Sequence, residues 1–464
     1  MIGAGSGGLS AARFAARLGF RVALFEKHRI GGDCTWTGCV PSKALIHAAA
    51  VAHSARRAAK LGLPAAAGPA DLARVREQVR EAISTVYRHE TPERLREEGI
   101  DVVLDPASFL DSRRIRAGGH DFEARRYLIC TGARPARPAI TGLDSVPYLT
   151  YENIFDLDVL PRKLIVIGSG PIGVEMAQAF RRLGSEVCLV GSRILRRDEP
   201  EVAEVLSEVL SREGIRIVPE RALTVSADGG ELSVRTATRE LHGDRLLVAA
   251  GRRPNVEDLG LERAGVRFSE RGIGVDSNLR ASVRSIYAAG DVTGGPQFTH
   301  LAGWQAVYAA RNALLPGNGG GREGLVPWTS YTSPEVAHAG LTESRARELH
   351  GNAVRVARWE MTRTDRAVCE DATGGFVKLV HHRNGKILGA TIVAARAGEM
   401  ISEIVLAMTQ GIRLQTLATV IHPYPTYATA VQELAAWTAL NRVLSGLSGR
   451  LLRLFVRKGR WFRE

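Results

Sequence analysis

The fold is decided by two stretches of sequence, IGAGSGGLSAARFAARLGFRVALFE at residues 2–26 and IGSGPIGVEMAQAFRRLGSEVCLVG at residues 167–191. Each has a short apolar strand end, a glycine-rich turn, a helical segment closed by a glycine, and a second strand. A unit of this kind opens a doubly wound α/β domain. The internal repeat therefore predicts two Rossmann-like nucleotide-binding domains in one chain.

The first repeat carries the G-x-G-x-x-G pattern at Gly3, Gly5 and Gly8. The first glycine permits the tight turn, the second lets a pyrophosphate approach the backbone, and the third lets helix and strand pack closely. Glu26 ends the next strand, at the position where a carboxylate accepts hydrogen bonds from ribose hydroxyls. We interpret this turn as an FAD site; the alternative is a glycine-rich turn without a ligand.

The second repeat carries the same pattern at Gly168, Gly170 and Gly173, but Gly191 stands where the first repeat has Glu26. A missing carboxylate with guanidinium groups nearby suits a 2′-phosphate. This turn therefore predicts NADPH rather than NADH, although NADH stays possible and the arginines could form a solvated basic loop. The arginines that follow Gly191 are Arg193, Arg196 and Arg197.

A cysteine pair follows the first repeat, in GGDCTWTGCVPSK at residues 31–43. Zinc sites usually have two pairs with shorter spacing, and no second pair exists, so no metal site is expected. Cys39 precedes a predicted helix near Pro41, and a helix N-terminus stabilises a thiolate. Cys34 and Cys39 therefore form a candidate redox dithiol, against the alternative of two ordinary buried cysteines.

The remaining pattern predicts a further domain. A glycine-rich stretch at residues 316–324 is typical of a linker, and apolar runs after it predict strands of an α+β domain that ends near residue 445. Before the linker we expect helices at residues 41–60 and 71–98, and strands at residues 127–132 and 246–251.

Bulk properties exclude several classes. A chain of 464 residues needs more than one core, and it has neither a long apolar span nor a signal peptide, so we expect a cytoplasmic protein. The net charge of +13 comes from arginines spread along the chain, which favours a basic surface without nucleic acid. The exception is the basic and aromatic tail at residues 446–464, which could contact an anionic membrane or pack as a helix on the domain.

Almost the whole chain resembles the pyridine nucleotide–disulfide oxidoreductase family, most closely its mercuric reductase-like and dihydrolipoamide dehydrogenase-like members. The resemblance rests on the two repeats and the cysteine motif together with CTGARP (130–135), AAGRRPN (249–255), YAAGDV (287–292), SPEVAHAGLTE (333–343) and GEMISEI (398–404). It implies an FAD-binding domain at residues 1–150 and 276–315, an NAD(P)-binding domain at 151–275 and an interface domain at 325–445. It also implies a homodimer in which each active site is completed by the neighbouring subunit.

The resemblance also implies residue roles. Cys34 matches the thiol that meets the acceptor, and Cys39 matches the thiol beside the flavin. Lys43 matches a lysine near the reactive flavin nitrogen, with Glu175 as its carboxylate partner. Further matches to cofactor-binding positions are Asp291, at the FAD ribityl chain, and Thr131, Gly132 and Gly251.

The chain departs from the family in two places. Met1-Ile2-Gly3 leaves almost nothing of the strand before the first turn, so we expect a start site placed too far downstream or a removed upstream segment, rather than a protein without this strand. In IHPYPTYATA (421–430), Tyr424 and Thr429 stand where many members carry a catalytic His and Glu, and His422 lies two residues earlier. No cysteine follows Cys369, so a C-terminal pair that hands Hg(II) inward is missing, and Cys130, Cys188 and Cys369 are interpreted as structural.

These observations predict an FAD-dependent NAD(P)H oxidoreductase that passes electrons through FAD and the Cys34–Cys39 disulfide to an acceptor. That acceptor is a small disulfide, a metal ion or a quinone. One alternative is a transhydrogenase, diaphorase or quinone reductase in which the thiols are idle. Another is a non-catalytic nucleotide-binding redox sensor.

Overall fold

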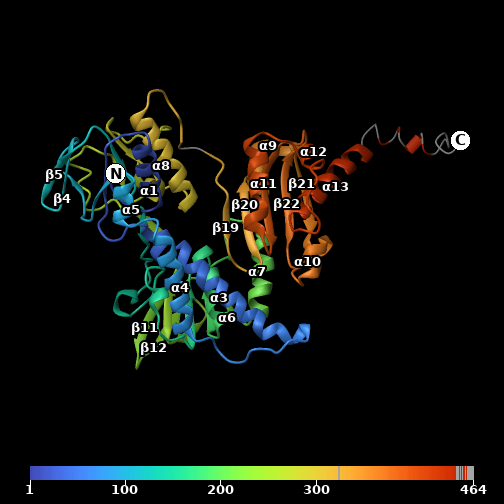
Figure 1. The fold of residues 1–464 in the computed structure, drawn as a ribbon. Helices are drawn as coiled ribbons and strands as arrows, with labels where there is room; N and C mark the ends of the chain where they lie inside the picture. The colour runs from blue at the N-terminus through green and yellow to red at the C-terminus, as the bar shows by residue number, and fades with distance from the viewer. Residues whose placement is uncertain (322–323, 446–448, 450, 452, 455, 457–464) are drawn as a thin grey trace. The chain divides into compact units, whose positions relative to one another are not determined.

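The computed structural model describes residues 1–321, 324–445 and, after them, 449, 451, 453, 454 and 456. It divides into two compact units (Figure 1). Unit 1 comprises residues 1–193 and 210–324, and unit 2 comprises residues 194–209 and 325–464. Each unit is described by itself.

The first sheet of unit 1 is parallel and is joined at its centre by a single residue. Ile2 bridges Phe25 of β1 on one side and Ile129 of β6 on the other. A single residue thus pairs with both neighbouring strands, and it is buried in the core. The strand pairs on its two sides are β1 (Val22–Phe25) with β2 (Ile100–Val103), and β6 (Tyr127–Ile129) with β18 (Ile286–Ala288).

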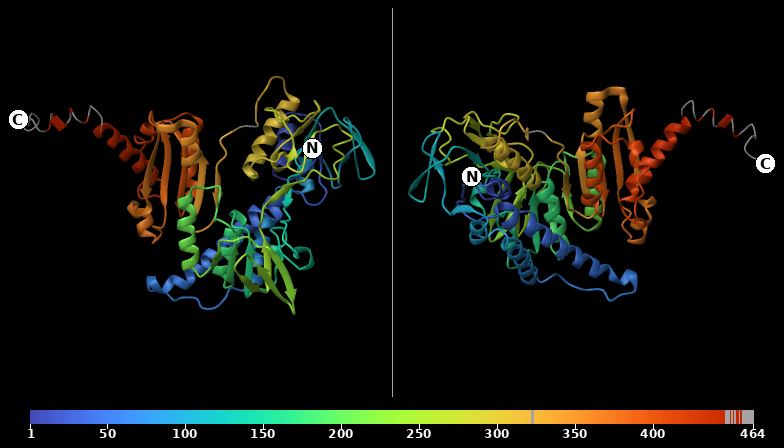
Figure 2. Two further views of the ribbon diagram at one scale, coloured as in Figure 1. Left: turned by 180° about the vertical axis from the view of Figure 1, so that it is seen from behind. Right: turned by 45° about the horizontal axis from the view of Figure 1, so that its top comes forward.

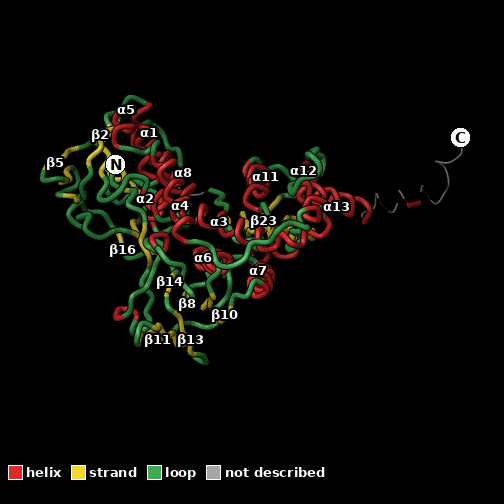
Figure 3. The backbone as a smooth tube through the Cα atoms, turned by 60° about the horizontal axis from the view of Figure 1, so that its bottom comes forward, coloured by secondary structure: helices red, strands yellow, loops and turns green. Residues whose placement is uncertain are grey.

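Two helices cover this sheet and lie side by side. They are α1 (Ser6–Arg17) and α8 (Thr299–Leu314) (Figure 3). The small residues Ala11, Ala306 and Ala309 are buried in one cluster between sheet and helices, and their size allows the two helices to approach closely. A three-stranded antiparallel sheet shares a separate buried cluster with the first sheet and consists of β3 (Ser108–Phe109), β4 (Arg114–Ala117) and β5 (His120–Glu123).

The second half of unit 1 repeats this plan around a four-stranded parallel sheet of order β10-β9-β8-β14. Its strands are apolar and buried, as expected for a sheet covered on both faces. The bounds are β8 (Lys163–Ile167), β9 (Glu186–Val190), β10 (Arg216–Val218) and β14 (Arg245–Val248), with helix α6 (Pro171–Leu183) after β8. A further antiparallel sheet consists of β11 (Thr224–Asp228), β12 (Glu231–Arg235) and β13 (Glu240–Gly243).

Two long helices follow the cysteine motif and pack against each other in unit 1. Helix α3 (Cys39–Arg57) continues into a short 3-10 turn, and α4 (Leu72–Tyr87) packs against it. The segment 71–98 is two helices rather than one, because Thr91 caps a new helix, α5 (Pro92–Glu97), with its side chain on the Arg94 N–H.

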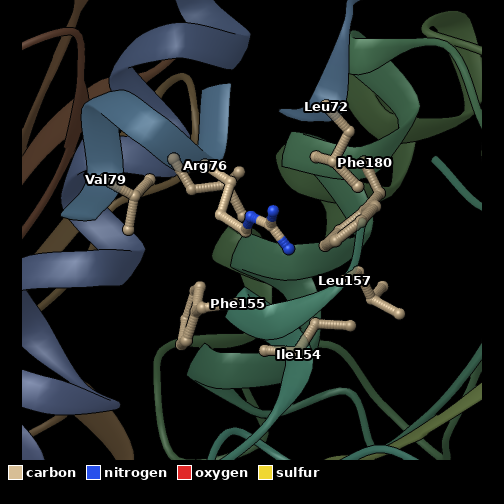
Figure 4. A pocket seen from close by; sticks show the side chains of 8 residues that line it. Leu72, Arg76, Val79, Ile154, Phe155, Leu157 and Phe180 are labelled. Carbon is tan, nitrogen blue, oxygen red and sulfur yellow. The ribbon is translucent and has the colours of Figure 1, made fainter. Parts of the chain in front are cut away.

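A small pocket lies between α4, α6 and the turn at residues 154–157. Its walls are apolar apart from Arg76 (Figure 4). The Arg76 guanidinium donates to the Asp156 carbonyl and pairs with Asp158. None of the predicted site residues lines it, so we regard it as a packing gap. The lining residues are Leu45, Leu72, Arg76, Val79, Ile154, Phe155, Leu157 and Phe180.

Unit 2 is built on a five-stranded antiparallel sheet of order β19-β20-β23-β22-β21 (Figure 2). Helix α11 (Ala397–Thr409) packs on β20 and β23, and α13 (Thr429–Ser445) contacts β21 and β22. The strands are β19 (Trp328–Ser330), β20 (Glu335–Gly340), β21 (Val354–Glu360), β22 (Phe376–His382) and β23 (Ile387–Ala394). Among the described residues, no helix has both the length and the apolar character needed to cross a bilayer.

Candidate active site

In the first glycine-rich turn, two of the three glycines are required by the packing of the chain. The third leaves open space that a dinucleotide could fill. A Cβ on Gly3 would lie 2.4 Å from the Cys130 carbonyl oxygen, and one on Gly8 would lie 1.8 Å from the Gly3 oxygen. A Cβ on Gly5 would meet only the Gly32 Cα, at 3.7 Å. Packing therefore requires Gly3 and Gly8, whereas the space over Gly5, at the N-terminus of α1, suits a pyrophosphate that approaches the backbone.

The second turn shows the same division. A Cβ on Gly173 would lie 1.7 Å from the Gly168 oxygen, whereas one on Gly170 would meet nothing within 4 Å. Gly170 also has an ordinary extended backbone, with φ −78° and ψ −177°, so neither conformation nor packing requires a glycine there. The open space over Gly170, at the N-terminus of α6, therefore suits a second pyrophosphate.

The two cysteines of the motif are free thiols at the start of α3 and on the short helix α2 (Gly32–Trp36). Cys39 is the first residue of α3, two residues earlier than the sequence suggests. A hydrogen bond from Cys34 lowers the pKa of Cys39 to about 6, and Thr299 and the Lys43 ammonium act in the same direction against burial. The same bond, together with burial, raises the pKa of Cys34. The pair therefore holds one thiolate, on Cys39.

The Lys43 ammonium lies 2.9 Å from a carboxylate oxygen of Glu175, which joins α3 to α6. The Glu175 side chain is 5% exposed and that of Lys43 is 37% exposed. A buried carboxylate so placed fixes the lysine near Cys39, because an unpaired charge at that depth would be costly.

Thr299 is a site residue that sequence reasoning misses. Its hydroxyl oxygen lies 3.2 Å from Cys39 Sγ, and Thr299 is the first residue of α8. A hydroxyl and a helix N-terminus both favour a thiolate. The signal is weak in the sequence, because 260 residues separate the two positions.

An ion-pair network beside the motif is a second feature that sequence reasoning misses. Arg252 bonds Asp33 at 2.5 Å and Asp291 at 3.1 Å, and the Tyr151 hydroxyl donates to Asp33 at 3.2 Å. Burial raises the pKa of both carboxyls, while Arg252 opposes that rise. Arg252 thus links Asp291, the predicted ribityl contact, to the residue directly before Cys34.

Thr131, Gly132 and Gly251 lie where the segment 131–136 hydrogen-bonds the segment 251–255 in unit 1. The Thr131 hydroxyl donates to the Asn255 carbonyl at 2.7 Å, and the Asn255 N–H donates to Gly132 O at 3.0 Å. Gly251 accepts from Ala136 N–H at 2.9 Å. These contacts lie at the ends of the antiparallel pair β7 (Ala133–Pro135) and β15 (Arg252–Pro254). The predicted cofactor role of the three residues stays a prediction.

The residues from the C-terminal motif belong to unit 2. Burial opposes a charge on His422, but Glu403 at 3.0 Å and the Val420 carbonyl at 3.1 Å outweigh it and raise the pKa of His422. Both ring nitrogens face acceptors, which favours the protonated imidazole. The Tyr424 hydroxyl donates to Asp365 at 2.5 Å, which raises the pKa of the phenol, and Thr429 bonds the Thr426 carbonyl.

The other predicted positions divide between the units. Arg193 belongs to unit 1 and Arg196 to unit 2. Cys130 is buried and Cys188 is half-buried on β9, which fits a structural role. Cys369, interpreted as structural from the sequence, is instead exposed, because it is the last residue of the short helix α10 (Asp365–Cys369).

Comparison with known families places this arrangement in a class. The family described as pyridine nucleotide-disulphide oxidoreductase matches residues 1–306, and its dimerisation domain matches residues 326–435. The chain belongs to this family and is an enzyme of its class. Members are FAD-dependent and use NAD(P)H.

Individual relatives narrow the likeness to the mercuric reductase-like flavoprotein disulfide oxidoreductases. A mercuric reductase from Streptomyces lividans is 36% identical, with 96% of each chain covered. A dihydrolipoyl dehydrogenase from Thermus scotoductus is 33% identical over 94% of this chain and 96% of its own. Among solved structures, the HOCl-induced flavoprotein disulfide reductase RclA from Escherichia coli has a TM-score of 0.85 and 27% identity, with 94% of this chain and 98% of that chain covered.

Proposed function

We propose that this protein transfers two electrons from NADPH, in preference to NADH, to an acceptor through the Cys34–Cys39 pair. The observation that carries the proposal is the thiol pair itself: Cys34 hydrogen-bonds Cys39, and Cys39 is favoured as a thiolate. FAD, when bound at the first turn, supplies the two-electron chemistry that connects a nicotinamide to thiols.

The two thiols have different tasks. Cys39, supported by Thr299 and Lys43, keeps the thiolate on the cofactor side. Cys34 meets the acceptor. When the Cys34 thiol and the Cys39 thiolate close to a disulfide, they give two electrons to the acceptor and release the one proton of Cys34, to the acceptor where its reduced form binds it and otherwise to solvent. Glu175 keeps Lys43 in place, and Asp291 and Glu26 would hold the ribityl chain and the ribose of FAD.

The acceptor is a small disulfide, a quinone or a soft metal ion. Tyr424 bears on this choice because its phenol donates to Asp365 and retains its proton. A tyrosine so held is a poor acid for a leaving thiolate, which favours acceptors that need no such proton.

The proposed assembly is a cytoplasmic homodimer through the region matched by the dimerisation domain. We assign FAD to residues 1–150 and 276–315, the nicotinamide nucleotide to 151–275, and the interface to 325–445. Gly191 in place of a carboxylate and the neighbouring Arg193 support NADPH.

A thiol count tests the proposal. The FAD-loaded protein, oxidised or reduced anaerobically with NADPH, is freed of nucleotide, denatured and titrated with a chromogenic disulfide. Reduction should expose two more thiols per chain in the native protein and in Cys369→Ser, which removes an exposed cysteine outside the pair. Cys34→Ser should show no such gain. Equal counts before and after reduction of the native protein would contradict the role of the pair.

A further inference from the structure

The two glycine-rich turns differ at two positions that lie next to each other in space: the residue after the first glycine and the residue that follows the second strand. In the first turn, Ala4 follows the first glycine, and its N–H donates to a Glu26 carboxylate oxygen at 2.8 Å. The carboxylate at the end of the second strand thus folds back onto the turn. The equivalent positions of the second turn are Ser169 and Gly191.

In the second turn the Ser169 side chain fills the space that a residue at 191 would need. A Cβ on Gly191 would lie 2.5 Å from Ser169 Oγ, 2.8 Å from its Cβ and 2.8 Å from its backbone nitrogen. The backbone of Gly191 lies outside the left-handed region, so its conformation does not require a glycine. The close approach of Ser169, through its side chain and its backbone nitrogen, does require one.

The serine is also anchored. Its hydroxyl donates to the Arg193 carbonyl at 2.9 Å, and the residue is 9% exposed. This hydrogen bond fixes the backbone of the segment 191–193 against the glycine-rich turn. Ser169 therefore has two effects. It leaves no space for a side chain at 191, and it fixes the backbone position of Arg193.

We propose that Ser169 is a specificity-determining residue for the nicotinamide nucleotide. It keeps a carboxylate away from the place where ribose hydroxyls would be recognised, so NADH loses its usual partner, while a 2′-phosphate meets no opposing charge there. This inference rests on the proposed NADPH preference and names the residue that imposes it.

The consequence is a coupling between two positions. Gly191→Glu alone places its Cβ against Ser169 and distorts the turn, so it cannot reproduce the arrangement at Glu26. Ser169→Ala with Gly191→Glu rebuilds the Ala4–Glu26 pair and removes the shortest contact. The remaining contacts, at 2.8 Å to the Ser169 Cβ and backbone nitrogen, are still too close, so the backbone at 191 must move away from the turn as well.

The test is the dissociation constants of NADP⁺ and NAD⁺ for the FAD-loaded protein, measured by calorimetry without turnover. The native protein should bind NADP⁺ more tightly by about tenfold or more. Gly191→Glu should weaken NADP⁺ without tightening NAD⁺, and the double variant should bind NAD⁺ about tenfold more tightly than Gly191→Glu does. Ser226→Ala, on the exposed hairpin strand β11, is the matched control and should change neither constant.

Ser169→Ala alone keeps the test decisive if the double variant fails to fold. Loss of one hydrogen bond, typically about 1 kcal/mol, should reduce the preference for NADP⁺ by about fivefold. An unchanged preference, or a full gain of NAD⁺ affinity in Gly191→Glu alone, would overturn the role of Ser169. Equal affinity of the native protein for both nucleotides would instead contradict the NADPH preference on which the inference rests.

Discussion

At the scale of single residues, the charge of Cys39 is what the surrounding side chains control. Three groups converge on its sulfur from distant parts of unit 1: the Cys34 thiol, the Thr299 hydroxyl and the Lys43 ammonium. Each stabilises the thiolate, and burial and the Glu175 carboxylate oppose it. The thiolate should therefore be present above a pH of about 6 and be lost below it.

Thr299→Val tests one of these contributions. A hydrogen bond to a charged group is worth about 1.5–3 kcal/mol, and one pKa unit is about 1.4 kcal/mol. The pKa of Cys39 should thus rise by about one unit or more, which the pH dependence of Cys39 alkylation would measure. Thr299→Ser should retain the native value, as should Thr293→Val, whose hydroxyl bonds only the Gly290 carbonyl. An unshifted profile in Thr299→Val would contradict a direct bond.

Tyr424 is the residue that separates classes of acceptor. Its phenol donates to Asp365 and has a raised pKa, so it holds its proton at neutral pH. Glutathione disulfide and lipoamide should react more slowly than quinones, by the factor of about 10²–10⁴ that acid–base help typically gives. Tyr424→His should raise disulfide turnover. Fast turnover of either disulfide by the native enzyme, abolished in His422→Ala, would return the role to His422.

At the scale of elements, a buried lysine fastens helix α7 (Pro200–Arg212) and helix α9 (Glu343–His350) to the sheet of unit 2. Lys378 on β22 is 3% exposed, and its ammonium lies within 3.3 Å of carboxylate oxygens of Glu199, Glu201 and Glu343. One cation thus holds three carboxylates together, and without it they would repel one another.

Lys378→Met should therefore destabilise the protein strongly. Removing one partner of a buried ion pair typically costs about 3–5 kcal/mol, because the other charge stays buried and uncompensated. Lys386→Met, which removes an exposed lysine from the turn between β22 and β23, should change the free energy of unfolding by less than about 0.5 kcal/mol. Denaturant unfolding of both variants measures the difference. Equal free energies of unfolding for the two variants would contradict a stabilising role of Lys378.

The elements also show how far sequence reasoning extends. The two βαβ repeats, the glycine turns and the β22–β23 strands follow from local patterns, because strand and helix periodicity and turn chemistry act over a few residues. The division of 71–98 into α4 and α5 follows from the Thr91 cap and Pro92, which a periodicity argument overlooks. Thr299, the Asp33–Arg252–Asp291 network and the His422–Glu403 pair depend on tertiary contacts between remote segments, which no local pattern encodes.

At the scale of the whole molecule, the tail at residues 446–464 falls mostly outside the described residues, and its membrane contact stays a proposal from composition. The full chain should co-sediment with anionic vesicles and not with neutral ones, since interleaved arginines and large apolar residues favour an anionic surface. A chain truncated after Ser445 should remain in the supernatant. Identical sedimentation of both chains would exclude the contact.

The central claim is that electrons reach the acceptor through Cys34 and Cys39, and an anaerobic titration of the FAD-loaded protein with NADPH tests it most directly. A working thiol pair beside a flavin stores a second electron pair, so the account predicts uptake of two NADPH equivalents per chain in the native protein and one in Cys34→Ser. Uptake of a single equivalent by the native protein, unchanged in Cys34→Ser, would contradict the account.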